Sequence, residues 1–139
     1  MTDRKTQEAV VVRVIDQFWN GQALDRIGEV FTDDAVIHFG ATDYVGHAGI
    51  IDEFAQPFMA AFPDLKHDIL ALLIDGDRAA MRYRGTGHMQ KDYGGARAAG
   101  QPFEYHGIAI FRVDEGRVAE VWSNSDMANW LAAQPRVRS

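Results

Sequence analysis

Apolar positions near the start of the chain recur at the spacing of one helix face. Residues 4–19 contain a stripe with the i, i+3, i+4, i+7 pattern, formed by Val11, Val14, Ile15 and Phe18. The stripe ends at Asn20 and Gly21, a pair that commonly terminates a helix because glycine readily adopts the conformation of the cap. The pattern therefore predicts an amphipathic helix over residues 4–19.

The next segment mixes short helical and extended patterns. A short helix is predicted first, with one apolar side made of Leu24, Ile27 and Phe31. Residues 35–39, "AVIHF", then predict a short strand. A longer helix is predicted from Gly46 to Phe62, with a kink at Pro57, because proline lacks an N–H and clashes with the preceding turn. Its apolar stripe consists of Ile50, Ile51, Phe54, Phe58 and Phe62.

The second half of the chain has the pattern of β-strands joined by tight turns. Two hairpins are predicted around the turns "DGD" and "DEG", made of residues 67–74 with 79–88 and residues 103–113 with 117–126. Residues 89–101 are rich in Gly and Ala without a period, which predicts a loop of the length that often contacts ligands. Residues 127–134 predict a short closing helix.

This order of elements predicts a single α+β domain over residues 1–139. Helices come first and antiparallel strands follow, which favours α+β over a doubly wound parallel sheet. A chain of 139 residues suits one hydrophobic core. Its 47% of hydrophobic and 24% of charged residues are ordinary for a soluble globular protein.

Charge and cysteine content narrow the expected partners. A net charge of −6 argues against nonspecific binding to nucleic acid or to an anionic membrane, because both require a basic surface. The absence of cysteine excludes disulfides, thiolate nucleophiles and Cys-ligated metals. No signal peptide and no run of about 18 apolar residues is present, so the cytoplasm is the expected location. The remaining partner class is a neutral or weakly polar small molecule.

The last predicted strand closes with "EVWSNSD", which puts a carboxylate in register with an apolar position. Side chains alternate across a strand, so Asp126 shares one face with Trp122 and Asn124. If "DEG" is a three-residue loop, Glu104 lies opposite Asp126, and His106 becomes its diagonal neighbour at about 7–8 Å between backbones. A slip of one residue in the turn would break this pairing.

The composition of this predicted face is that of a small-molecule site. It has an apolar floor and a polar rim, made of Ile108, Ile110 and Trp122 and of Glu104, His106, Asn124 and Asp126. Desolvation there would raise the pKa of Asp126 toward a range useful for general acid/base catalysis. Alternatively, Asp126 caps the helix that begins at Met127, and His106 is a hydrogen-bonded histidine without a catalytic role.

Several segments together resemble the SnoaL-like polyketide cyclases of the NTF2-like superfamily, over nearly the whole chain. They are "FWN", "FTDDAVIH", "AAFPDLKHDI", "DGDRAAMRYRGTG" and "GQPFEYHGIAIFRVDEGRVAEVWSNSD". The last is the most specific, because its G-I-x-I-F-R-V and G-R-V-x-E-x-W-x-x-x-D spacing is characteristic of the family. Two segments of this chain depart from the family pattern. One is "GTGH", where many members have Gly-Thr-His, and the other is the loop "KDYGGARAAG".

The resemblance implies a cone in which a curved antiparallel sheet wraps around N-terminal helices and encloses an apolar cavity. It also implies homodimers packed through the sheet, and an intramolecular aldol closure of a polyketide ring without metal or organic cofactor. The family's acid/base residue, the Asp four positions after the Trp, falls on Asp126. If Asp126 moves the proton, His106 or Asn124 could donate a hydrogen bond to the developing oxyanion. The remaining pocket residues are then Phe18, Phe54, Phe58, Arg82, His88 and Trp122.

Other chemistries fit the sequence less well or remain open. The five histidines show no HxH or HxxxH spacing, so no metal site is expected. Epoxide hydrolases on this scaffold use an Arg-x-Asp pair, whereas this chain has Arg82-Tyr83-Arg84 and lacks that carboxylate. Arg82 could then hold a substrate oxygen, or simply lie in solvent or at a dimer interface.

Two further functions stay open. Proton transfer of the ketosteroid-isomerase type also needs a lone carboxylate in an apolar cavity, and Tyr83 or Tyr105 would have to supply its hydroxyl donor. A cone that only binds a ligand or dimerises, without turnover, is the alternative from a different class. An exposed Asp126 bonded to the backbone of residues 128–129 would favour the binding module, and a buried Asp126 near His106 would favour the enzyme.

Overall fold

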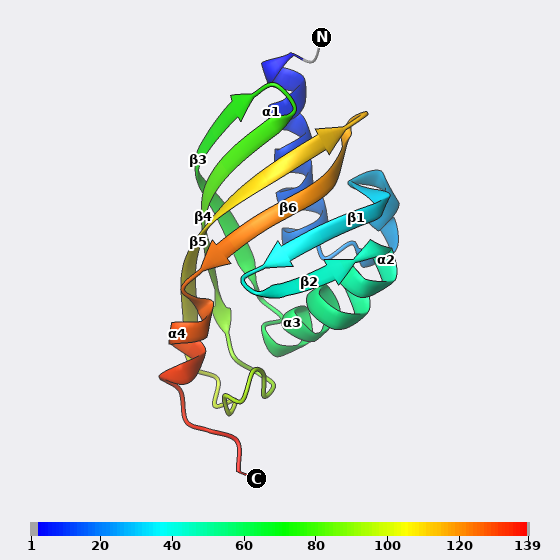
Figure 1. The fold of residues 1–139 in the computed structure, drawn as a ribbon. Coiled ribbons are helices and arrows are strands. Elements are labelled where there is room, and N and C mark those ends of the chain that lie inside the picture. Colours follow the sequence, from blue (N-terminus) through cyan, green and yellow to red (C-terminus); the bar gives the residue numbers. More distant parts are fainter. Residues whose placement is uncertain (1–2, 139) are drawn as a thin grey trace.

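The fold is a curved sheet with helices on its inner face (Figure 1). The computed structural model describes residues 3–138, which contain a six-stranded sheet in the order β2-β1-β6-β5-β4-β3. β1 and β6 run parallel, and every other pair of neighbouring strands runs antiparallel. This architecture confirms the predicted α+β class and the curved sheet wrapped around N-terminal helices.

The first predicted helix is continuous in the structure. It consists of α1 (Arg4–Arg13) and the more widely wound turns of η1 (Val14–Asn20). Asp3 caps its start by accepting a hydrogen bond from the N–H of Lys5. At its end, the side-chain amide of Asn20 pairs with the N–H and the C=O of His67, at 2.7 and 2.9 Å. These two hydrogen bonds tie the helix end to the start of β3 (Lys66–Asp75).

The segment between the long helices differs from its prediction in two places. The short helix is η2 (Leu24–Glu29), and Phe31 is not part of it but opens the strand β1 (Phe31–Phe39). A second short strand, β2 (Thr42–Val45), pairs with β1 and was not predicted. Its four residues, "TDYV", are too few to show a period, and pairing with β1 decides their conformation.

The third predicted helix is confirmed over residues 46–61. It is built from α2 (Gly46–Ala48), η3 (Gly49–Ala55) and α3 (Gln56–Ala61). Pro57 lies in the first turn of α3, directly after the wide turns of η3, where a residue without an N–H is accommodated.

Both predicted hairpins are present. They are formed by β3 with β4 (Arg78–His88) and by β5 (Pro102–Asp114) with β6 (Arg117–Ser125), and α4 (Met127–Ala132) follows. The register of the second hairpin differs from the prediction. Glu115 and Gly116 have positive φ angles of 50° and 82°, so the turn has two residues and not three. A bulge at Ala119 in β6 shifts the pairing once more, since Val113 pairs with Val118 and Arg112 pairs with Glu120.

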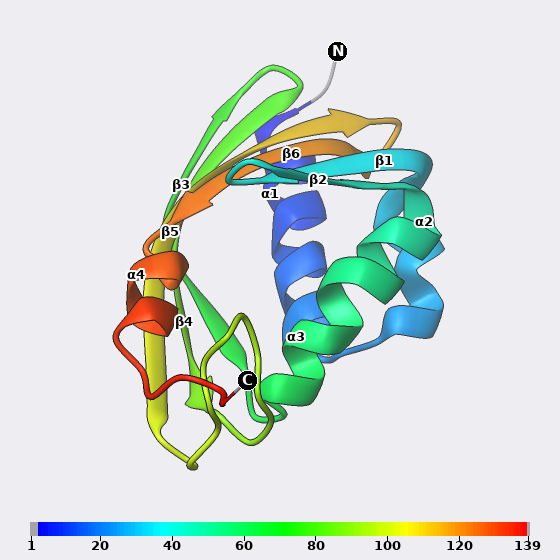
Figure 2. The same ribbon diagram turned by 60° about the horizontal axis from the view of Figure 1, so that its bottom comes forward.

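Curvature gives the two faces of the sheet different surroundings. In Figure 2 the strands arch over α1 and α3, which lie on the concave side. Along β5 the side chains alternate regularly, with odd-numbered residues such as Tyr105 and Phe111 buried and even-numbered residues such as Ile108 exposed. The core therefore lies between the concave face and the helices. No helix within residues 3–138 is long and apolar enough to cross a membrane.

Candidate active site

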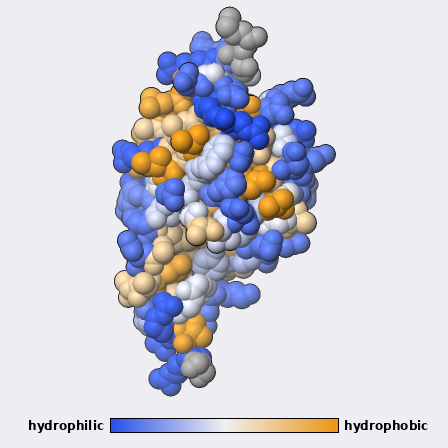
Figure 3. Space-filling view, viewed as in Figure 1, coloured by the Kyte–Doolittle hydropathy of each residue, from blue (hydrophilic) through white to orange (hydrophobic). Residues whose placement is uncertain are grey.

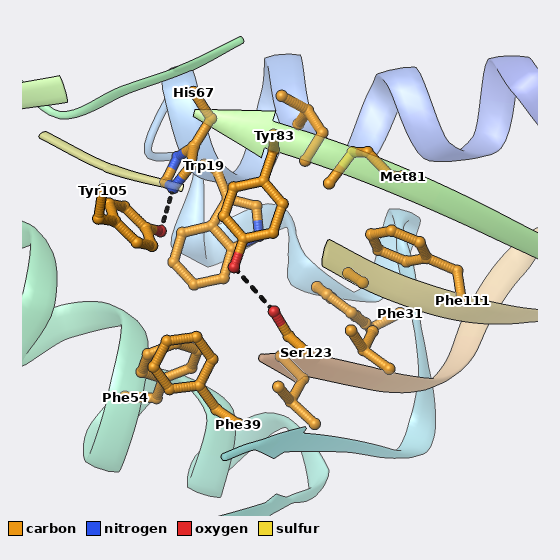
Figure 4. Close-up of a pocket in the computed structure, with 14 residues that line it drawn as sticks. Trp19, Phe31, Phe39, Phe54, His67, Met81, Tyr83, Tyr105, Phe111 and Ser123 are labelled. Atoms are coloured by element: carbon orange, nitrogen blue, oxygen red, sulfur yellow. Dashed lines mark hydrogen bonds between the residues drawn. The ribbon is translucent and has the colours of Figure 1, made fainter. Parts of the chain in front are cut away.

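An apolar cavity lies between the concave face of the sheet and the helices (Figure 4). Its free volume is about 50 Å³. Aromatic and aliphatic side chains form most of the wall, and among residues 3–138 no Asp, Glu, Lys or Arg takes part. The lining residues are Ile15, Trp19, Phe31, Ile37, Phe39, Phe54, His67, Met81, Tyr83, Tyr105, Ala109, Phe111, Val121 and Ser123.

His67 and Tyr105 form the first polar pair of this wall. Nε2 of His67 lies 2.5 Å from the hydroxyl oxygen of Tyr105, which is a short hydrogen bond between two buried groups. His67 is 6% exposed and Tyr105 is 3% exposed. The histidine lies on β3 and the tyrosine lies on β5. The side chain of Asn20 bonds the backbone of His67. The pair therefore depends on contacts between segments that are distant in sequence.

Tyr83 and Ser123 form the second polar pair. Their hydroxyl oxygens lie 2.8 Å apart, so one hydroxyl donates a hydrogen bond to the other across strands β4 and β6. The rings of Tyr83 and Tyr105 have centroids 5.7 Å apart, which makes the two polar pairs neighbours (Figure 4). Together they give the cavity one polar edge.

Two glycines make room for the tyrosine rings. In the ladder between β4 and β5, Tyr83 lies opposite Gly107 and Tyr105 lies opposite Gly85. A Cβ atom at either glycine would collide with the ring opposite it. The two Tyr-x-Gly segments therefore interlock, and each ring lies across the neighbouring strand on the concave face.

Burial keeps the polar groups of the cavity uncharged. It lowers the pKa of His67 from 6.5 to about 4, because a buried imidazolium would lose its hydration. Burial also raises the pKa of Tyr83 and of Tyr105 above the usual value of 10.0, since a buried phenolate is disfavoured for the same reason. At neutral pH these groups offer hydrogen bonds and no ion pair.

Asp126 lies outside this cavity, so the prediction that its carboxylate faces a closed pocket is wrong. Its side chain is 52% exposed and accepts a hydrogen bond of 2.8 Å from the backbone N–H of His106. The capping alternative is not observed either, because Asp126 precedes α4 but makes no capping hydrogen bond. The altered register puts Asp126 beside His106 and not opposite Glu104. The catalytic role that the resemblance implies for Asp126 stays a prediction, as does the role of hydrogen-bond donor predicted for His106.

The other polar residues predicted to line the pocket also lie elsewhere. Even-numbered residues of the central strands point to the convex face, and these include Arg82, His106, Trp122 and Asn124. His88 is exposed at the end of β4, where its Nδ1 lies 2.6 Å from a carboxylate oxygen of Asp64. Their predicted positions in the pocket are wrong, because the helices cover the opposite face of the sheet.

One of the three predicted phenylalanines lines the cavity, and that residue is Phe54. Phe18 and Phe58 are fully buried behind the wall. Phe18 packs edge-on against Trp19 with ring centroids 5.1 Å apart, and Phe58 packs edge-on against Tyr105 at 6.1 Å. They therefore support lining residues and do not themselves face the free space.

His67 and Ser123 were not predicted as pocket residues, and Tyr83 and Tyr105 were predicted only as alternative hydroxyl donors. A signal was available in the two Tyr-x-Gly segments, "YRG" and "YHG", which fall on adjacent predicted strands. Glycine inside a strand often marks a close approach of another group. Among residues 3–138, no group of three or more His, Cys, Asp or Glu side chains is arranged to hold a metal ion.

The family model of the SnoaL-like polyketide cyclases matches residues 9–134. The chain belongs to this family. A search of curated proteins found no match.

Solved structures of the SnoaL-like fold agree with this membership. A proposed SnoaL-like polyketide cyclase from Jannaschia sp. CCS1 has a TM-score of 0.84 and 22% identity, covering 97% of this chain and 100% of that one. AclR, a proposed hydroxylase from Streptomyces galilaeus, has a TM-score of 0.81 and 24% identity, covering 99% and 91%. IdmH, a proposed polyketide cyclase from Streptomyces antibioticus, has a TM-score of 0.77 and 26% identity, covering 91% and 99%. The fold is therefore shared among proteins proposed to perform different reactions.

Proposed function

We propose that the cavity binds a compact, uncharged, hydrophobic carbonyl compound and promotes aldol-type acid/base chemistry on it without a metal or organic cofactor. The observation that carries this proposal is the combination of an apolar wall, two neutral polar pairs at one edge and no charged residue among the described lining residues. An anion or cation in such a site would lose its hydration without gaining a counter-ion. Membership of the SnoaL-like family supports the class of reaction.

The hydroxyls of Tyr83 and Tyr105 suit the oxygen of a reacting carbonyl group. Loss of a proton next to a carbonyl leaves an enol or enolate, in which negative charge develops on oxygen. A fixed donor in a dry site stabilises that charge more than water does. The lining residues include no carboxylate, and the pKa of the lining histidine is about 4, so the α-proton passes to a water molecule or a buffer base while the hydroxyls stabilise the charge on oxygen.

The size of the cavity restricts the ligand. A free volume of about 50 Å³ admits a compact ring only if neighbouring side chains adjust. Trp19 is the lining residue best placed to report such a change, because it is partly exposed and contacts Phe54 and His67, with ring centroids at 5.4 and 5.8 Å. Its fluorescence should therefore change when the cavity fills.

The test uses cyclopentanone and cyclohexanone as compact neutral ketones. Binding is followed by tryptophan fluorescence, and exchange of the ketone α-protons for deuterium in D₂O is followed by NMR. The proposal expects saturable binding and exchange faster than in buffer. Tyr105→Phe should retain the fold and slow the exchange by about 10²–10³-fold. Ketones that neither bind nor exchange faster than in buffer would contradict the proposal.

Binding without turnover is the second candidate, and the exposed position of Asp126 favours it. The same experiment separates the two functions. A binding module would show saturable binding of a ketone with exchange at the buffer rate, whereas an enzyme would accelerate exchange in proportion to its occupancy.

We further propose that the chain forms a homodimer through the convex face of the sheet, with a second copy of the chain as occupant. Ile108 and Ile110 on β5 are 59% and 43% exposed, and Leu73 on β3 is 68% exposed. Figure 3 shows apolar side chains among polar ones on this side of the molecule. An apolar centre with a charged surround is the usual make-up of such an interface.

A further inference from the structure

Of the two ring nitrogens of His67, one has a hydrogen-bond partner among the described residues and the other has none. Nε2 of His67 bonds the hydroxyl of Tyr105, as Figure 4 shows. Nδ1 of the same ring is buried and has no hydrogen-bond partner among the described residues. Since buried polar groups are normally paired, the choice of which nitrogen carries the proton has an energetic consequence.

The first arrangement puts the proton on Nδ1. Tyr105 then donates its O–H to Nε2, and its hydroxyl proton is no longer available to a ligand. The Nδ1–H is left as a buried donor without an acceptor among the described residues, and nothing in the cavity can reach it because Nδ1 is sealed. Orphaned buried N–H groups are rare in proteins, which marks this arrangement as costly.

The second arrangement puts the proton on Nε2. The imidazole then donates to the oxygen of Tyr105, and the orphaned atom is a lone pair on Nδ1. The Tyr105 O–H is then not used by His67 and can turn toward the cavity that Tyr105 lines, with the hydroxyl of Tyr83 as its other neighbour. An acceptor oxygen of a bound molecule can satisfy it there, and this arrangement therefore gains from an occupied cavity while the first does not.

We propose that His67 is a positioning residue that holds the Nε2–H tautomer and directs the hydroxyl proton of Tyr105 into the cavity, toward the oxygen of an uncharged ligand. This inference rests on the proposed function for the identity of the ligand, but the tautomer is a property of the free protein.

The surrounding structure holds the pair in one geometry. Asn20 fixes the backbone of His67 with two hydrogen bonds, and the ring of Trp19 packs edge-on against the imidazole at 5.8 Å. Gly85 lies against both partners, because a Cβ there would collide with the Tyr105 ring and come within 3.1 Å of Nε2 of His67. The absence of a side chain at Gly85 thus permits the short contact between imidazole and phenol.

The first experiment needs no ligand. Long-range ¹H–¹⁵N correlation spectra of the ¹⁵N-labelled protein report which ring nitrogen of each histidine is protonated, and His67→Gln assigns the signals of His67. We expect a neutral ring with the proton on Nε2 at pH 7, and no protonation of this ring at pH 5.5. A ring that carries its proton on Nδ1 would overturn the inference, even if the cavity binds ketones as proposed.

The second experiment tests whether His67 acts on a ligand through the hydroxyl of Tyr105. Its probe is cyclohexanone labelled with ¹³C at the carbonyl carbon. Its infrared stretching frequency reports the strength of the hydrogen bond to the bound oxygen, and its dissociation constant is measured in parallel. Tyr105→Phe should weaken binding roughly two- to tenfold, as expected for one hydrogen bond, and remove most of the frequency shift. His67→Leu should have a similar effect, and His67→Gln should restore part of the shift, because its amide can still donate to Tyr105.

The decisive comparison is the double variant. If His67 acts through Tyr105, His67→Leu should have little further effect on affinity in the Tyr105→Phe background. In the Tyr83→Phe background, which removes the other phenol hydroxyl, it should keep its full effect. An undiminished effect of His67→Leu in the Tyr105→Phe background would overturn the positioning role. Cyclohexanone that fails to bind would contradict the proposed function, and the tautomer measurement would then decide the inference alone.

Discussion

Tyr105 and Gly85 face each other on adjacent strands, and the tyrosine ring occupies the space that a side chain at position 85 would fill. The same relationship holds between Tyr83 and Gly107. These contacts bring both phenol groups to the wall of the cavity. The two glycines are therefore needed to position the tyrosine hydroxyls of the site.

Substituting Gly85 with alanine should destabilise the fold and disturb the cavity. The new methyl group would displace the buried ring of Tyr105, and overpacking of this kind typically costs about 1–3 kcal/mol. Urea unfolding measures the loss. Gly28→Ala is the matched control, because the nearest atom to its Cβ is a carbon of His47 at 3.7 Å, an ordinary contact. Equal stability of the two variants would show that the ring of Tyr105 is not confined as described.

Burial of His67 should make the protein less stable in mild acid. The folded-state pKa of about 4 lies below the ordinary 6.5, so the unfolded chain binds a proton more readily than the folded one between these values. Stability should therefore rise with pH from about 4 to 6.5, and the difference corresponds to about 3 kcal/mol from this residue. Urea midpoints across this range measure it. His67→Gln should remove this part of the pH dependence, and His88→Gln, at an exposed site, should retain it.

His38 should make the folded protein less stable as the pH rises above 6.5, which is the opposite of the effect of His67. Its Nδ1 lies 2.7 Å from Asp43 and its Nε2 lies 2.6 Å from Glu120, and these hydrogen bonds raise its pKa in the folded state. The stabilisation is fully present below the ordinary 6.5 and is lost as the pH rises through the folded-state pKa. A neutral imidazole has one N–H and can donate to one carboxylate only. His38→Gln should flatten stability measured by thermal unfolding from pH 6 to 9; an unchanged slope would contradict the prediction.

Asp126→Asn tests the role that the family resemblance implies. The amide oxygen of Asn can still accept the hydrogen bond from the N–H of His106, so the fold should be retained. Because the carboxylate lies outside the cavity, we expect exchange of ketone α-protons to proceed at the wild-type rate. A reduction by about 10²–10⁴-fold, typical for loss of a general acid/base, would show that Asp126 reaches the substrate after all. Circular dichroism of the variant checks that the fold is intact.

The proposed dimer can be tested on the convex face. Ile108→Asp should shift the protein toward the monomer in sedimentation experiments, since it puts a charge at an apolar position of the interface. Val12→Asp is the control, because Val12 is 38% exposed on α1, on the other side of the sheet. Identical sedimentation of the wild type and Ile108→Asp would argue against this interface.

Periodicity and turn residues predicted most of the fold. The helices at 4–19 and 46–62 and the two hairpins follow from side-chain spacing, which is a local property of the chain. The register of the second hairpin did not follow, because the two-residue turn at Glu115 and Gly116 and the bulge in β6 depend on pairing between strands. The four residues of β2 were missed because so short a strand is decided by its neighbour.

The sequence by itself determined that β5 and β6 have two distinct faces, since side chains alternate along a strand. It did not determine which face is covered, because both carry large apolar residues: Ile108, Ile110 and Trp122 on one, and Phe103, Tyr105 and Phe111 on the other. The covered face is decided by tertiary structure, because the helices pack against the face that carries the odd-numbered residues of β5. This packing encloses His67 and Tyr105 within the core and leaves Asp126 at the surface, because burial depends on contacts between distant segments and not on the local pattern.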